Sequence, residues 1–119
     1  MPIETKIRLF VDVDDTLILY NKVGPNPYGV YMGTPYGVNE KLVEGIRAFA
    51  KENPQSLIVV WSGGGQRYAQ EWAENLHIYH LVACLGKDET TIDLVREGDI
   101  AVDDMPTSWR THDPFEWPE

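Results

Sequence analysis

Cysteine and long apolar runs are the scarcest features of this sequence. Cys84 is its only cysteine, so no intramolecular disulfide can form, which agrees with a reducing compartment such as the cytosol. No uninterrupted apolar stretch reaches membrane-spanning length, and residues 1–6 lack the basic-then-apolar order of a secretory signal. We therefore expect a soluble, unprocessed cytoplasmic protein with no membrane partner.

Basic residues are also few. The chain has 10 Lys and Arg residues against 19 Asp and Glu residues, a formal net charge of -9, so its field should repel polyanions at long range. Nonspecific nucleic-acid binding is therefore disfavoured. A nucleotide or an exposed nucleic-acid end stays open as a substrate, because acidic residues that gather in one site can be offset there by a bound cation.

Internal repeats, low-complexity tracts and linkers are absent from the sequence as well. With 119 residues, of which 43% are hydrophobic, the chain has the size of one compact domain with a real core. We expect residues 1–119 to form a single domain. The sequence leaves its oligomeric state open.

Short apolar runs, partly β-branched and ending in polar residues, predict buried parallel strands. Apolar residues at helical spacing predict helices, the first of which Asn39 should cap. Strands are expected at about 7–11, 57–61, 80–85 and 100–102, and helical patterns cover about 39–52, 68–76 and 90–97. No regular structure is predicted for the tail from residue 109 to 119. Strands that alternate with helices indicate an α/β domain with a parallel sheet.

The segment from residue 17 to 37 is rich in Gly, Pro and Tyr. Its turn signal at 24–27 lies between the apolar segments 17–20 and 30–32 and predicts a projecting β-hairpin, or flap. The tyrosines of this flap either pack within the protein, which is the more common role, or stack on a substrate. They are Tyr20, Tyr28, Tyr31 and Tyr36.

Polar groups follow each predicted strand where the strand ends, and in such sheets these points line the ligand crevice. They are Asp12, Asp14, Asp15 and Thr16 after the first strand, Ser62 and a glycine run after the second, Lys87 after the third, and Asp103 and Asp104 after the fourth. Every strand therefore delivers a group suited to a phosphate or to a hard cation.

The chemistry of these groups is coherent. Magnesium prefers hard oxygen ligands in octahedral geometry, so converging carboxylates suit it. Phosphoryl transfer places negative charge on the equatorial oxygens, which a metal ion, a lysine and backbone N–H groups stabilise. Lys87, the Ser62 hydroxyl and the N–H groups of Gly63 and Gly64 at a helix start can supply that stabilisation.

The four motifs together resemble those of the haloacid dehalogenase-like (HAD) phosphatase superfamily. Its first motif, a strand followed by Asp-x-Asp-x-Thr, is similar to residues 12–16, and its second, a Ser or Thr that closes a strand, to Ser62. Its lysine motif is similar to Lys87, and its final acidic pair to residues 103–104. The resemblance covers residues 7–104. It implies a Rossmann-like three-layer sandwich with a central parallel sheet and a β-hairpin flap.

Carried over to this chain, the resemblance implies a magnesium-dependent phosphatase. Asp12 would attack phosphorus and form an aspartyl-phosphate. Asp14 would first protonate the leaving oxygen and then activate the water that hydrolyses the intermediate. Lys87 would complete the catalytic set by stabilising the phosphoryl oxygens.

The resemblance also implies how metal and substrate are held. The Mg2+ ligands would be Asp12, the backbone carbonyl of Asp14, and Asp103, with Asp104 direct or through water. Thr16 would steady the Asp14 loop. The substrate-binding residues would be Thr16, Ser62, Gly63, Gly64 and Lys87.

Two features depart from the usual HAD pattern. Asp15 stands where Gly is common, although Asp tolerates a left-handed backbone better than most residues. The segments that follow Thr16 and Ser62 are too short for a folded cap domain. The chain thus resembles capless relatives, which act on large or exposed phosphates or borrow a lid from a neighbouring subunit. We expect the substrate to be a phosphorylated small molecule or an exposed phosphate on a macromolecule.

Other interpretations stay open. A response-regulator receiver gathers similar groups around magnesium, but it brings its acidic pair with the first strand and its lysine last. A catalytically weak HAD fold that binds a phospholigand or regulates another protein is the main alternative to the enzyme. His77, His80 and Cys84 suggest zinc, but they lack a fourth ligand. Arg67 and Arg110 would bind a second anionic group or, more commonly, form surface salt bridges.

Overall fold

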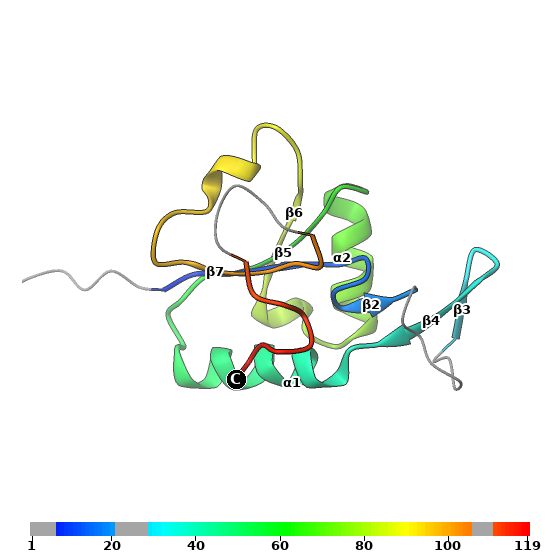
Figure 1. Cartoon of the computed structure of the whole chain (residues 1–119), viewed down its shortest axis with the longest axis horizontal. Coiled ribbons are helices and arrows are strands. Elements are labelled where there is room, and N and C mark those ends of the chain that lie inside the picture. Colours follow the sequence, from blue (N-terminus) through cyan, green and yellow to red (C-terminus); the bar gives the residue numbers. More distant parts are fainter. Residues whose placement is uncertain (1–6, 21–28, 106–110) are drawn as a thin grey trace, which may run out of the picture.

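A four-stranded parallel sheet forms the centre of the fold. The computed structural model describes residues 7–20, 29–105 and 111–119, and in it the strands follow the order β6-β5-β1-β7 (Figure 1). They are β1 (Leu9–Asp12), β5 (Ile58–Ser62), β6 (Ala83–Gly86) and β7 (Ile100–Val102). β1 pairs in parallel with both β5 and β7. The expected α/β architecture with a parallel sheet is therefore confirmed, and all four strands end at the same edge.

Two α-helices cover one face of this sheet. They are α1 (Glu40–Glu52) and α2 (Gln66–Asn75). The Asn39 side chain caps α1 as expected, accepting a hydrogen bond from the Leu42 N–H at 3.3 Å. Alternate strand residues such as Leu9 and Val11 pack with both helices in the larger core cluster. Neither helix of the described residues is long and apolar enough to cross a bilayer.

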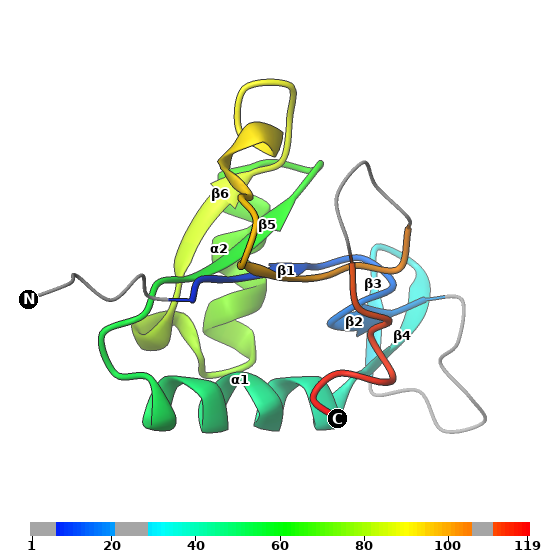
Figure 2. The ribbon, with the colours of Figure 1, turned by 60° about the vertical axis from the view of Figure 1, so that its left-hand side comes forward.

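The opposite face of the sheet is covered by the loop that joins β6 to β7, which contains a single short helix. Phe10, Val59, Trp61 and Ala101 form a smaller core there, against which Ile92 and Val95 pack. The loop lies on the other side of the sheet from α1 (Figures 1 and 2). Its helix η2 (Ile92–Leu94) is a 3-10 turn.

The expected helix at 90–97 is therefore wrong. The Asp88 side chain accepts hydrogen bonds from the backbone N–H groups of Thr90 at 2.8 Å and Thr91 at 3.1 Å. Such local side-chain bonds compete with helix formation. The expected strand at 80–85 is also shorter, because residues Tyr79–Leu81 form the 3-10 helix η1 and β6 begins at Ala83.

A small antiparallel sheet extends beyond the carboxyl end of β1 (Figure 1). Its order is β2-β4-β3, with β2 (Ile18–Leu19), β3 (Gly29–Tyr31) and β4 (Thr34–Val38). The expected pairing of 17–20 with 30–32 is wrong, because both β2 and β3 pair with β4. Met32 and Gly33, at φ 47° and 80°, make the tight turn between β3 and β4. The turn signal at 24–27 and Tyr28 lie outside the described residues.

Aromatic side chains join this small sheet to α2. The ring centroids of Tyr31 and Tyr36 lie 5.5 Å and 5.0 Å from that of Trp72. Tyr20 lies 6.5 Å from Tyr36. These three tyrosines therefore pack within the protein, the more common of the two roles expected for them.

The C-terminal segment, residues 111–119, runs from the edge of β7 to α1 (Figure 2). The His112 N–H donates to the Ala101 carbonyl at 2.8 Å, and the Asp103 N–H donates to the His112 carbonyl at 3.3 Å. Trp117 is buried beside Phe49, with centroids 6.3 Å apart. The close approach of this segment leaves no room for a side chain at Gly45. The C-terminal segment thus contacts the edge strand β7, the helix α1 and Asp103.

Candidate functional site

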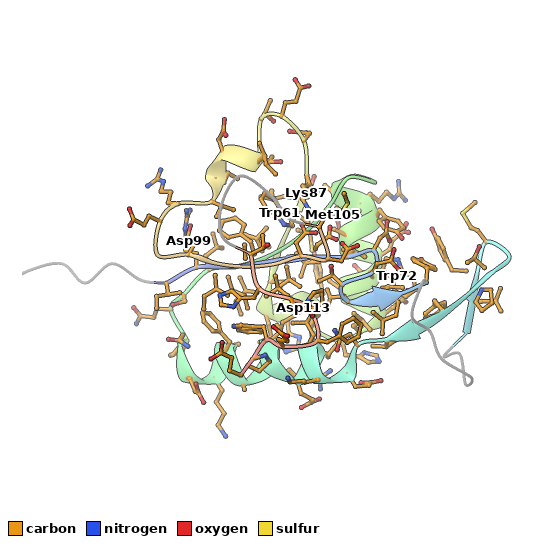
Figure 3. The ribbon with its side chains drawn as sticks, in the orientation of Figure 1. Trp61, Trp72, Lys87, Asp99, Met105 and Asp113 are labelled. Atoms are coloured by element: carbon orange, nitrogen blue, oxygen red, sulfur yellow. The ribbon has the colours of Figure 1, made fainter. Side chains whose placement is uncertain are left out.

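The strand ends surround an open depression of about 420 Å³. Most of the polar residues expected at the strand exits line it, together with the exposed Met105. Figure 3 shows Lys87, Trp61 and Met105 at this part of the sheet. The complete lining consists of Asp12, Asp14, Asp15, Gly63, Lys87, Asp103, Asp104 and Met105.

Three carboxylates converge in the depression. Asp12 ends β1 and is 8% exposed, Asp103 follows β7 and is 5% exposed, and Asp104 is exposed. Each offers one carboxylate oxygen, and these three oxygens lie within 4.8 Å of one another. Burial, followed by the charge of Asp103, raises the pKa of Asp12 to about 7, although Lys87 opposes this. Three hard oxygen donors this close could hold a metal ion, which would relieve their mutual repulsion.

Lys87 is the cation of the site. Its Nζ forms ion pairs with Asp12 Oδ1, at 3.5 Å, and with Asp103 Oδ2. Burial lowers the pKa of Lys87, but the hydrogen bond to Asp103 and the charge of Asp12 raise it more, so that it stays above its usual value. The backbone N–H of Lys87 donates a hydrogen bond to the Ser62 carbonyl at 2.8 Å, and the side-chain Nζ lies 5.7 Å from the Trp61 ring centroid. The ends of β5 and β6 thus fix the lysine beside two carboxylates.

Thr16 connects the two acidic strand ends from beneath. It is 0% exposed, and its Oγ1 lies 3.2 Å from Asp12 Oδ2 and 3.4 Å from Asp104 Oδ1. The Asp104 N–H donates to the same oxygen at 3.1 Å. Thr16 therefore orients carboxylates of the site, and its hydroxyl is buried below the depression that a substrate would enter.

Of the residues expected in the segment after β5, only Gly63 lines the depression, and Ser62 and Gly64 do not. Ser62 is buried, and its Oγ accepts a hydrogen bond from the Gly64 N–H at 3.0 Å. Because the Gly64 N–H is already bonded to Ser62, Gly63 is the glycine whose N–H is better placed to meet an anion.

Asp14 lies at the rim and has a partner that the sequence did not reveal. The side chain of Asp14 is exposed, and its Oδ1 accepts a hydrogen bond of 2.6 Å from the Tyr68 hydroxyl of α2. Tyr68 was expected only on the apolar face of its helix. The available signal was its position one turn after the glycine run, which places a helix residue near the strand ends. Asp15 has φ 58°, the left-handed conformation expected to be tolerable there.

The remaining candidates lie outside this cluster. In the described part of the chain, Asp12, Asp103 and Asp104 are the only group of three or more acidic, His or Cys side chains close enough to hold a metal ion. His77, His80 and Cys84 do not form such a group. Arg67 pairs with Glu71 along α2 at 3.7 Å, the salt-bridge role. Arg110 lies outside the described residues.

Fold and site together define an α/β protein whose parallel sheet ends in an acidic cluster with one lysine. Comparison with known proteins found no matching family, no similar curated protein and no similar solved structure. The function is therefore argued from the site itself.

Proposed function

We propose that this protein is a magnesium-dependent phosphatase of the HAD type that uses Asp12 as its nucleophile. The observation that carries the proposal is the environment of Asp12. Its carboxylate lies close to two other carboxylates and to the Lys87 ammonium, and it lines an open depression. A hard cation and a phosphoryl group need these opposite charges next to each other.

The residues fit a magnesium ion as donors of hard oxygen. Asp12, Asp103 and Asp104 supply carboxylate oxygens within 4.8 Å of one another, and the backbone carbonyl of Asp14 completes the proposed protein ligands. When bound, Mg2+ would neutralise charge on the phosphoryl oxygens and on the carboxylates. Lys87 and the Gly63 N–H, which both line the depression, would bind the remaining phosphoryl oxygens, and the buried Ser62 hydroxyl would hold this segment through its bond from the Gly64 N–H.

The reaction then has two steps. An Asp12 oxygen bonds to phosphorus as the ester P–O bond breaks, and the leaving oxygen keeps the electron pair and takes a proton from Asp14. Water next attacks the aspartyl-phosphate, Asp14 accepts its proton, and the Asp12–phosphate bond breaks. The products are the alcohol and inorganic phosphate, and both carboxyl groups return to their starting states.

We further propose a capless, Rossmann-like arrangement in which the antiparallel sheet acts as the flap. In support, β2 begins two residues after Thr16, and the tyrosines of the sheet reach α2 beside Asp14. An open site of this kind suits an exposed phosphate on a small molecule or a macromolecule.

The test is hydrolysis of 4-nitrophenyl phosphate with Mg2+ and with a chelator. We expect activity only with Mg2+, and we expect Asp12→Asn to reduce it to background because the amide is not a nucleophile. The matched control is Asp93→Asn, an exposed aspartate on η2, which should keep the wild-type rate. Activity that survives Asp12→Asn, or that a chelator leaves unchanged, would refute the mechanism.

The same preparation separates the enzyme from a phospholigand-binding protein. Magnesium-dependent binding of inorganic phosphate without any turnover would favour the binding protein. With turnover, a screen of nucleotides, sugar phosphates, phosphopeptides and end-phosphorylated oligonucleotides would identify the substrate class.

A further inference from the structure

A chain of two tyrosines leads to Asp14 from outside the acidic cluster. Tyr68 on α2 donates its hydroxyl proton to Asp14 Oδ1 at 2.6 Å, although 54 residues separate them. The hydroxyl of Tyr20, next to β2, lies 3.3 Å from that of Tyr68. These contacts join Asp14 to both α2 and the small antiparallel sheet.

The direction of the hydrogen bonds follows from proton counting. A phenol has one hydroxyl proton, and Tyr68 uses it in the hydrogen bond that it donates to Asp14 Oδ1. Tyr20 must therefore donate to Tyr68. A tyrosine hydroxyl keeps its proton at neutral pH, so Tyr68 is available as a donor. A donor fixed on Oδ1 of Asp14 leaves Oδ2 as the oxygen that can carry an acidic proton.

The rings that carry these hydroxyls are held by packing. Tyr68 meets Tyr31 edge to face, with centroids 6.1 Å apart, and Tyr31 packs on Trp72 at 5.5 Å. The Asp14 side chain, in contrast, is exposed. An exposed side chain on a loop samples several rotamers unless a fixed partner restricts it.

We propose that Tyr68 is a positioning residue that holds the Asp14 carboxyl in the orientation needed for proton transfer to the leaving oxygen. This inference rests on the proposed phosphatase function. The tyrosine touches neither the phosphorus nor the leaving group. It acts through Asp14 by fixing Oδ1, so that Oδ2 delivers the proton and later receives one from water.

Leaving-group dependence tests this role. 4-Nitrophenyl phosphate releases a weakly basic phenolate that needs little help from an acid, whereas phenyl phosphate releases a more basic one that needs a proton. General acid catalysis contributes about 10²- to 10⁴-fold, so a misplaced acid should lose about tenfold. We expect Tyr68→Phe to lower kcat/KM for phenyl phosphate about tenfold, and that for 4-nitrophenyl phosphate less than about threefold.

Two controls distinguish positioning from general damage to the fold. Tyr31→Phe removes a hydroxyl from the ring beside Tyr68 and should leave the ratio of the two kcat/KM values unchanged. In an Asp14→Asn background, Tyr68→Phe should cause no further fall, because its effect passes through Asp14. Tyr68→Phe and Tyr31→Phe should both unfold near the wild-type temperature.

The outcomes are separable. An equal fall for both substrates, no fall, or an additive fall in the Asp14→Asn background would overturn the positioning role while the phosphatase stands. If the wild-type protein hydrolyses neither phenyl phosphate nor 4-nitrophenyl phosphate, the proposed phosphatase function is wrong, and this inference fails with it.

Discussion

Replacing the proposed nucleophile should make the metal-free protein more stable. Asp12 has its pKa raised from 3.8 to about 7 by burial and by the charge of Asp103. This difference corresponds to roughly 4 kcal/mol of destabilisation when the ionised form folds at alkaline pH. In the wild type, Lys87 and Thr16 each donate a hydrogen bond to one carboxylate oxygen of Asp12. Asp12→Asn removes the charge, but the amide has only one oxygen and so can accept only one of these two bonds. Losing one such bond costs about 2 kcal/mol, so the net gain is about 2 kcal/mol.

The sign of the pH dependence is fixed by the raised pKa. The folded protein binds this proton more tightly than the unfolded chain, so its stability falls as the pH rises from about 4 to about 7 and is constant above. At pH 5 the destabilisation is only about 2 kcal/mol and cancels the lost hydrogen bond. The advantage of Asp12→Asn should therefore be full at pH 8 and vanish near pH 5.

The assay is urea unfolding with a chelator at both pH values. Asp99→Asn provides the control of opposite sign. Burial tends to raise the pKa of Asp99, but the hydrogen bonds from Arg8, 2.6 Å away, and from the Arg96 N–H lower it overall. This variant should lose stability at pH 8. If Asp12→Asn is less stable than wild type at pH 8, or keeps its advantage at pH 5, the electrostatic explanation is wrong.

Two further predictions concern metal binding and the C-terminal segment. Mg2+ at about ten times its dissociation constant should stabilise the wild type by about 1.4 kcal/mol and raise Tm by roughly 5 °C, and Asp103→Asn should lose most of this shift in a thermal scan. Trp117→Ala should cost about 3 kcal/mol in urea unfolding, because the ring is buried against Phe49; a loss below about 1 kcal/mol would show that the segment is only loosely attached.

The parallel sheet and the first helix could be predicted because their signals are local. Buried parallel strands are apolar on both faces, so their runs stand out, as in residues 58–62. The first helix combined a capping Asn39 with apolar residues at helical spacing. The acidic strand ends followed from the sheet, since parallel strands deliver their carboxyl ends to one edge.

The errors arose where distant or side-chain contacts decide the structure. β4 contains Pro35 and Gly37, which favour turns, and only pairing with β2 and β3 makes it a strand. The failed helix at 90–97 depends on Asp88 side-chain bonds. The hydrogen bond between Tyr68 and Asp14 could not be predicted from the spacing of residues in the sequence, because it joins a helix to a loop that is distant along the chain.

The three carboxylates and the lysine of the site carry charges that a divalent cation would balance. Asp12, Asp103 and Asp104 contribute three negative charges and Lys87 one positive charge, which leaves two negative charges unbalanced when all are ionised. A monovalent cation would leave these four side chains with a net negative charge that repels a phosphate dianion, whereas a divalent cation would balance them. Asp14 and Asp15 also line the depression and add to its negative field. Lys87 could then exchange its bond with Asp103 for a phosphoryl oxygen at little electrostatic cost. On the proposed mechanism, Lys87 would pair with the carboxylates in the metal-free protein and would bind a phosphoryl oxygen when Mg2+ and substrate are present.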